Sequence, residues 1–220
     1  MDSSHVALVS LNLQAEGFQD YRSDKPLTLG INMANLSKVM KLAGGDDSLT
    51  LRSEEDTNKL TIIFENAKQG KKTEFAMNLL TLDSEVLGIP EKDYQAKITT
   101  SGAEFTKLCR DLYQVAETVN IEAAEDNVTF TVEGDMGKGK VALSEGSNDK
   151  TDEKTTIEVK EPVKLSFALR YLNMFNKASS CSPSVSLMLS TETPLVVEFA
   201  MEKLGSIKFY LAPKITEEKD

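Results

Sequence analysis

The chain carries an internal repeat with a period of about 135 residues. In each copy a short helical pattern is followed by three runs in which apolar and polar residues alternate. The matching positions lie 134 to 136 residues apart: Leu36 with Leu172, Leu49 with Val185, Leu51 with Leu187, Leu60 with Leu195, Phe64 with Phe199, and Phe75 with Phe209. Four consecutive elements at nearly constant spacing predict two copies of one αβββ unit.

The periodicity of the whole chain is typical of an α+β protein. Short alternating runs, separated by Gly, Asn, Asp and Ser, predict antiparallel sheets. Three segments with a period near 3.6 residues predict short helices that lie against a sheet, at 33–42, 101–115 and 169–177. The second helix opens with the pattern Ser-x-x-Glu from Ser101, so we expect the Ser101 side chain to cap it.

The elements that precede the second copy have no counterpart before the first. A strand near 94–100, the helix from Ser101 and strands through Val141 come before the second copy, and one period earlier lies before Met1. We therefore expect the first domain to lack its first β-α-β segment, of about 35–40 residues, which leaves its sheet an open edge and an uncovered face. Either this domain is naturally short or the chain is missing its N-terminal part.

The overall charge limits the surface that nucleic acid can contact. The chain has 25 Lys and Arg against 35 Asp and Glu, a net charge of −10. This excess argues against a protein that binds nucleic acid over its whole surface, but it is compatible with a basic stripe on an acidic body. No apolar run approaches the ~20 residues of a membrane span, so we expect no membrane partner.

Residues for catalysis are scarce. His5 is the single histidine, so no zinc site with two histidine ligands can form. Cys109 and Cys181 lie far apart and are interpreted as free, buried thiols in a reduced compartment. The glycines from Gly134 to Gly139, followed by Lys140, have the spacing of a phosphate loop, but Val141 replaces the Ser or Thr that would hold magnesium. A glycine-rich hairpin fits better, and we expect no catalytic residue, metal or cofactor.

Six strings of the sequence carry a family resemblance: MDSSHVALV, LGIPEKDY, LCRDL, EPVKLSFALRYLN, TPLVVEF and LAPKI. In register over essentially the whole chain, they resemble the proliferating-cell nuclear antigen family of eukaryotic DNA sliding clamps. Relative to that family the chain begins about 39 residues late, at an internal Met, which agrees with the repeat. The resemblance implies two like-folded domains with short helices on one face of antiparallel sheets: 1–78, a connector at 79–96, and 97–220.

In the family, three chains close a ring around double-stranded DNA, and basic residues on the helices face the DNA. The matching positions here are Lys38 and Lys41 on the first helix, Lys107 and Arg110 on the second, and Lys177 at the end of the third. Contacts from these residues to phosphates alone would hold DNA without reading its sequence.

The resemblance also implies a hydrophobic groove beneath the connector, which takes a short peptide with one aliphatic and two aromatic anchors. The matching positions are Met1, His5, Val6, Leu8, Leu87, Ile89, Pro90, Pro194, Tyr210, Leu211, Ala212, Pro213 and Lys214. Ring closure in the family pairs two edge strands from neighbouring chains, here residues 72–79 and 138–144. Glu125 occupies the position of the usual ubiquitin-acceptor lysine, so we do not expect that modification at this site.

The function that the resemblance implies is that of a nuclear, non-enzymatic, homotrimeric clamp. Its partners would be the clamp loader, DNA polymerase, and other replication and repair proteins with clamp-binding peptides. One alternative is a truncated, clamp-derived adaptor that binds partner peptides without encircling DNA. A second is a small-molecule enzyme that uses His5 or the Gly134 loop.

Overall fold

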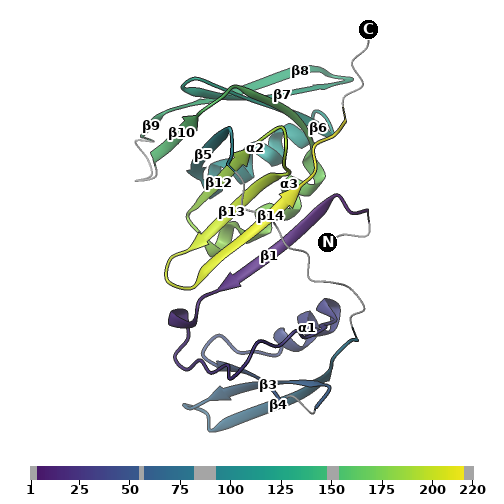
Figure 1. Ribbon diagram of the computed structural model, residues 1–220, viewed down its shortest axis with the longest axis vertical. Coiled ribbons are helices and arrows are strands. Elements are labelled where there is room, and N and C mark those ends of the chain that lie inside the picture. The colour runs from purple at the N-terminus through teal and green to yellow at the C-terminus, as the bar shows by residue number, and fades with distance from the viewer. Residues whose placement is uncertain (1–3, 55–56, 82–92, 148–153, 216–220) are drawn as a thin grey trace. The chain divides into compact units, whose positions relative to one another are not determined.

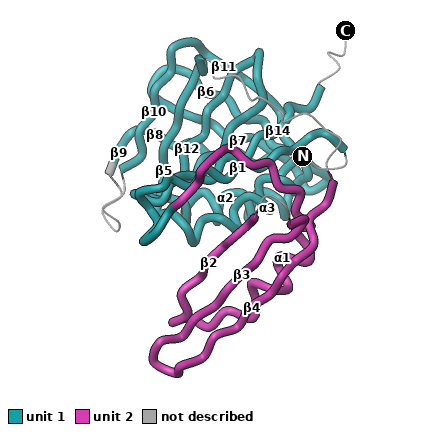
Figure 2. The backbone as a smooth tube through the Cα atoms, turned by 60° about the horizontal axis from the view of Figure 1, so that its bottom comes forward, with its two compact units in different colours: residues 1–21, 90–220 teal, residues 22–89 magenta. Residues whose placement is uncertain are grey.

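The computed structural model describes residues 4–54, 57–81, 93–147 and 154–215 (Figure 1). Its contacts divide the chain into two compact units (Figure 2). Unit 1 comprises Met1–Tyr21 and Pro90–Asp220, and unit 2 comprises Arg22–Ile89. These units differ from the expected domains, 1–78 and 97–220, in the place of the N-terminal segment. The first 21 residues belong to the larger unit because their strand joins its sheet.

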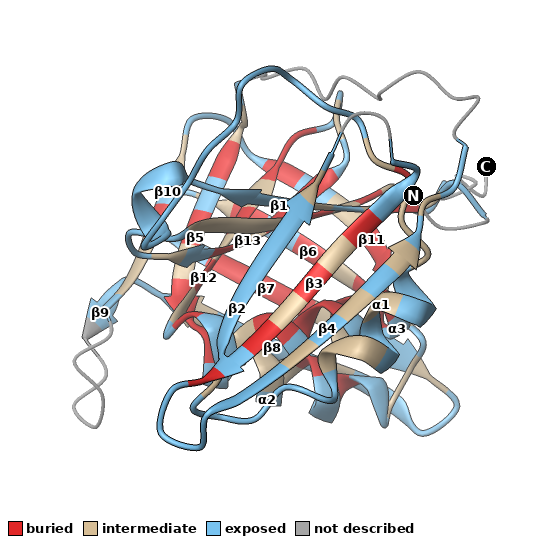
Figure 3. Cartoon of the chain, turned by 90° about the horizontal axis from the view of Figure 1, so that it is seen from below, coloured by how far each residue is buried: buried red, intermediate tan, exposed pale blue. Residues whose placement is uncertain are grey.

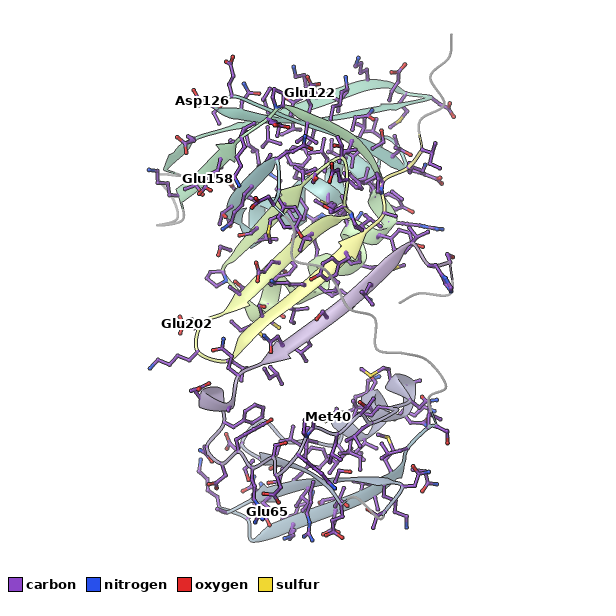
Figure 4. The ribbon with its side chains drawn as sticks, in the orientation of Figure 1. Met40, Glu65, Glu122, Asp126, Glu158 and Glu202 are labelled. Atoms are coloured by element: carbon purple, nitrogen blue, oxygen red, sulfur yellow. The ribbon has the colours of Figure 1, made fainter. Side chains whose placement is uncertain are left out.

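Unit 2 is one helix and a three-stranded antiparallel meander. Helix α1 (Met33–Met40) precedes β2 (Ser48–Ser53), β3 (Lys59–Asn66) and β4 (Lys71–Asn78), in the sheet order β2-β3-β4. The Asn32 side chain caps α1 by accepting the Asn35 N–H at 3.0 Å. Met40, labelled in Figure 4, packs with Leu36 and Val39 of α1 against the small core of the sheet.

The turn after α1 is held by a carboxylate. Asp47 accepts the Gly44 N–H at 2.8 Å and the Asn66 side-chain amide at 2.8 Å. These two donors, the Gly44 amide first, lower the pKa of Asp47 because they favour its charged form. The carboxylate thereby links the turn after α1 to the end of β3 by hydrogen bonds.

Unit 1 holds two sheets and a pair of helices around one hydrophobic core. The seven-stranded sheet has the order β1-β14-β13-β12-β5-β10-β9, and the four-stranded sheet has the order β11-β6-β7-β8. The strands are β1 (Ala7–Leu13), β5 (Ala96–Ser101), β6 (Thr118–Ala124), β7 (Asn127–Gly134), β8 (Gly137–Ser144), β9 (Gly146–Ser147), β10 (Lys154–Val159), β11 (Val163–Ala168), β12 (Ser184–Leu189), β13 (Leu195–Met201) and β14 (Gly205–Leu211). The helices are α2 (Gly102–Tyr113) and α3 (Leu169–Phe175), with 3₁₀ turns η1 (Ala15–Gly17) and η2 (Asn176–Cys181).

The predicted αβββ repeat is confirmed down to its strand register. In unit 2, Leu51 lies opposite Ile62, and Ile62 lies opposite Phe75. In unit 1 the residues one period later show the same cross-strand row, Leu187–Val197–Phe209. Helix α1 therefore corresponds to α3, and β2, β3 and β4 correspond to β12, β13 and β14.

The expected open edge and uncovered face are observed in unit 2. Within the described residues no strand pairs with the outer edge of β2, whereas the corresponding β12 pairs with β5. Leu49 and Leu51 on β2 are 44% and 53% exposed. Figure 3 shows β2 exposed along most of its length, while in β3 buried residues alternate with residues that are mostly of intermediate exposure.

Three local predictions need correction. Ser101 makes no side-chain capping bond, because β5 runs directly into α2 and the next residue, Gly102, donates its backbone N–H to Pro183 at 2.8 Å. The third helix ends at Phe175, and Lys177 lies in the 3₁₀ turn that follows. Cys109 is buried as expected, but Cys181 is exposed.

The two thiols should therefore differ in reactivity. Burial raises the pKa of Cys109 to about 12, so this thiol stays protonated and shielded in the folded protein. We expect a thiol-specific chromogenic reagent at pH 8 to modify one cysteine in the native chain and two after denaturation. The Cys181→Ser variant should show no fast reaction in its native state. Equal rates for both native thiols would contradict the buried position of Cys109.

Candidate nucleic-acid interface and partner surface

Helices α2 and α3 form a packed pair on one face of the seven-stranded sheet, behind β12, β13 and β14 in Figure 1. The Asn173 side-chain amide of α3 donates to the Cys109 carbonyl of α2 at 3.4 Å. Phe175 stacks on Phe209 of β14 with 4.5 Å between ring centroids, and Phe105 of α2 is fully buried. This packing fixes which side of each helix faces solvent.

The exposed side of this helix pair carries four basic residues, beside the carboxylates Glu104 and Asp111 of α2. Lys107 and Arg110 are exposed on α2, three residues apart and therefore on one face. Lys177 is exposed in η2 directly after α3. Arg110 approaches the Asp111 carboxylate at 3.8 Å. Among the described residues, Lys107 and Lys177 form no ion pair. The structure thus brings three of the five predicted DNA-facing residues onto one helical layer.

A fourth basic residue of this layer, Arg170, is not among those predicted. It is exposed on α3, seven residues before Lys177, and its guanidinium lies 4.8 Å from the centroid of the Tyr171 ring. The spacing of four and then three residues from Arg170 through Met174 to Lys177 is the helical signal that would have identified it.

The other two predicted residues, Lys38 and Lys41, belong to unit 2. Both are exposed, Lys38 in the last turn of α1 and Lys41 at its C-cap. The helix has no acidic residue in its first turn. In the part of unit 2 that the structure describes, neither lysine is held in an ion pair, so both ammonium groups are available for phosphates.

The acidic residues of unit 1 include a set on its strands and turns. Glu122 on β6, Asp126 in the β6–β7 turn, Glu158 on β10 and Glu202 in the β13–β14 turn are all exposed. Figure 4 labels these four carboxylates, which project outward from the sheets. Exposed lysines lie on the same strands, and Lys164 of β11 approaches the Glu122 carboxylate at 3.5 Å, so the strands of unit 1 carry both signs of charge.

A second surface of unit 1 combines both ends of the described chain. Strand β1 pairs with β14 so that Leu8 lies opposite Tyr210, and Tyr210 lies opposite Val196 of β13. The Ala212 N–H donates to the Val6 carbonyl at 2.9 Å and continues this pairing. Leu8 and Tyr210 are half-buried, so they present a partly exposed apolar row on the face opposite Phe209.

The remaining predicted groove residues divide into four groups. His5 (with a positive φ of 57°), Pro194 and Pro213 flank this row with exposed or half-buried side chains. Lys214 donates its backbone N–H to Ser166 at 2.8 Å and its ammonium to Thr118 at 2.6 Å, which fixes the chain beyond β14. Leu211 is fully buried in the core, on the opposite side of β14, and is not available to a peptide. The others, Met1, Leu87, Ile89 and Pro90, lie outside the described residues.

The two strands expected to close a ring are edges of their sheets. Strand β4 ends the sheet of unit 2, and β8 ends the four-stranded sheet of unit 1. On β8, Val141 lies opposite the buried Phe130 and is 36% exposed. Both edges therefore offer backbone groups and apolar side chains for pairing with a further strand.

The glycine-rich segment is the β7–β8 hairpin. Gly134 lies opposite Gly137, which has a φ of 127° that favours glycine. A Cβ on Gly134 would lie 2.1 Å from the Val115 carbonyl oxygen, so the glycine lets the hairpin approach the end of α2. Packing thus accounts for these glycines. Among the described residues there is no cluster suited to a metal, and no helix is long and apolar enough to cross a membrane.

Comparison with known protein families agrees with this architecture. Residues 1–86 match the N-terminal domain of proliferating cell nuclear antigen, and residues 88–214 match its C-terminal domain. The two matches cover nearly all of the chain, and they give it the fold of a sliding clamp, a non-enzymatic scaffold in DNA replication and repair. The chain therefore belongs to the proliferating cell nuclear antigen family.

Proposed function

We propose that this chain is a nuclear DNA sliding clamp, in which three copies form a ring around duplex DNA. The ring tethers polymerases and other replication and repair proteins that carry clamp-binding peptides, after a clamp loader has placed it on DNA. The observation that carries the proposal is the basic helical layer with Lys107, Arg110, Arg170 and Lys177 in a chain of net charge −10.

The chemistry of this layer suits sliding. Lysine and arginine attract phosphates from any sequence, and contacts to phosphates alone leave no preferred position along the duplex. Exposed carboxylates in the turns, among them Asp126 and Glu202, disfavour DNA at the turns. DNA therefore contacts the helices. The closed ring, and not tight binding, keeps the clamp from dissociating from the DNA.

The pairing of β1 with β14 is a template for ring closure. By the repeat, β14 corresponds to β4. Strands β1 and β8 are also alike, since each carries Val-x-Leu that begins four residues after a residue with positive φ, His5 or Gly137. We infer that β8 of one chain pairs antiparallel with β4 of the next, as β1 pairs with β14 within a chain.

This pairing predicts a monomeric variant. A carboxylate at Val141 would be buried without a partner between the chains, although it is partly solvated in the monomer. We expect Val141→Glu to shift the chain from trimer to monomer in sedimentation velocity at micromolar concentration, with an unchanged circular dichroism spectrum. Met136→Glu, at the 77% exposed tip of the same hairpin, is the control and should stay trimeric. A trimeric Val141→Glu variant would exclude β8 from the interface.

The helical layer predicts a specific change in salt dependence. Each phosphate contact that is lost should lower the slope of log K against log salt by about 0.9. We expect Arg110→Ala and Lys107→Ala to weaken duplex binding and to flatten this slope, measured by fluorescence anisotropy. Lys97→Ala removes an exposed cation from strand β5 and should leave the slope unchanged. Equal slopes for all three variants would remove α2 from the interface.

The row formed by Leu8 and Tyr210 supports a peptide-binding role. Partly exposed apolar side chains on a rigid sheet can bury the aromatic anchors of a short peptide. We expect Tyr210→Ala to weaken binding of a polymerase tail peptide by about 2 kcal/mol, or about thirtyfold, by calorimetry. Tyr113→Ala removes an exposed tyrosine from α2 and serves as the control. Wild-type affinity in Tyr210→Ala would refute this surface.

A second candidate function is an adaptor that binds partner peptides without encircling DNA. The row of Leu8 and Tyr210 favours it, because both residues belong to one unit of one chain and can bind a peptide without a ring. A wild-type chain that sediments as a monomer at micromolar concentration but still binds the tail peptide would support the adaptor over the clamp.

A further inference from the structure

One glutamine of unit 1 joins segments that lie far apart in the sequence. The backbone N–H of Gln95, directly before β5, donates to the Leu189 carbonyl at the end of β12, at 2.9 Å. Its backbone carbonyl accepts the N–H groups of Lys160 and Glu161 in the β10–β11 turn, at 2.7 and 3.3 Å. These bonds need no particular side chain, because every residue except proline offers the same backbone groups.

The half-buried side chain of Gln95 makes two further bonds. Its Oε1 atom accepts the Thr191 backbone N–H at 2.8 Å, and its Nε2 atom donates to the Glu161 carboxylate at 3.0 Å. These partners fix the orientation of the amide, since a backbone N–H can only donate and a carboxylate can only accept. Glutamine suits the position because asparagine is shorter, glutamate has no donor and lysine has no acceptor.

The bond to Thr191 holds a turn that carries one of the predicted groove residues. This turn lies between β12 and β13 and ends at Pro194. Pro194 lies two residues before Val196, and strand alternation therefore places both on the face where Val196 lies opposite Tyr210. Gln95 itself lies at the end of the predicted connector, 79–96. One side chain thus links the end of the connector to Pro194 and the surface that carries Tyr210.

A neighbouring ion pair contributes less to this link. The Lys160 ammonium approaches the Asp93 carboxylate at 3.5 Å, but these side chains are 69% and 99% exposed. Water and salt screen such a pair, so it adds little stability. The Gln95 amide is better placed, because both of its polar atoms are bonded and its partners lie in two different turns.

We propose that Gln95 is a positioning residue for the partner-peptide surface of unit 1. By accepting the Thr191 N–H, its side chain keeps the turn with Pro194 in the place that the peptide needs. The peptide then does not have to order this turn when it binds, which preserves affinity. Gln95 acts through the turn and does not touch the peptide. The inference rests on the proposed peptide-binding role of the row formed by Leu8 and Tyr210.

The test exchanges the hydrogen-bonding groups and measures binding of a synthetic polymerase tail peptide by calorimetry. Gln95→Glu keeps an acceptor for Thr191 but sets a carboxylate against Glu161, so we expect at least about fivefold weaker binding. The double variant Gln95→Glu with Glu161→Gln restores a donor opposite the carboxylate and should regain the wild-type affinity to within about twofold. Gln114→Ala, which removes an exposed glutamine at the C-cap of α2, is the control and should bind like the wild type.

A second readout does not involve the peptide. The Thr191 amide of the free chain should exchange with deuterium faster in Gln95→Ala than in the wild type, because this variant has no acceptor for the N–H. The circular dichroism spectrum should stay the same, because the backbone bonds of residue 95 remain.

Equal peptide affinity in the wild type and Gln95→Glu would overturn the positioning role, and so would a double variant that binds as weakly as Gln95→Glu. Unchanged exchange of the Thr191 amide in Gln95→Ala would overturn it as well. A wild-type chain without saturable peptide binding would instead refute the peptide-binding surface itself, and the positioning role with it.

Discussion

Each αβββ unit contains one apolar row that crosses its three strands, and unit 1 buries all three residues of this row. In unit 1 this row is Leu187–Val197–Phe209, and the stack of Phe175 on Phe209 fixes helix α3 above it. Helix α2 then covers α3, and strand β5 closes the edge. Burial of such side chains contributes about 1.5–3 kcal/mol each to the stability of the fold, so the row stabilises the helices and strands that pack on it. Unit 2 has the same row with less cover, and its helix has no buried residue.

The surface chemistry follows from this packing. A helix whose apolar stripe is buried against a sheet must present its other side to solvent. In α2 and α3 that side carries Lys107, Arg110 and Arg170, while exposed carboxylates lie on the strands and turns. The same burial that stabilises the fold therefore places these cations on the solvent side of the helices. A net negative chain acquires a positive helical layer without an overall basic composition.

The repeat, the open edge and the glycine-rich hairpin could be predicted because each rests on local pattern and spacing. Other features depend on contacts between distant residues. The pairing of β1 with β14 places the first 21 residues in unit 1, and no local pattern predicts it. The separation of Leu211 from Tyr210 depends on the strand, because neighbouring residues of a strand point to opposite faces, which puts the Leu211 side chain in the core and the Tyr210 side chain outside. Val196 lies opposite Tyr210 on the neighbouring strand, and this contact follows from the pairing of β13 with β14 and not from a local sequence pattern.

The most direct test of the clamp account asks whether the chain is held on DNA by topology. The protein is loaded onto a nicked circular plasmid by a clamp loader and isolated in salt that screens the helix cations. The account predicts that the chain stays with the circular DNA and is released when the plasmid is cut once, because a ring can then slide off an end. Equal retention on circular and linear DNA, or no retention on either, would contradict it.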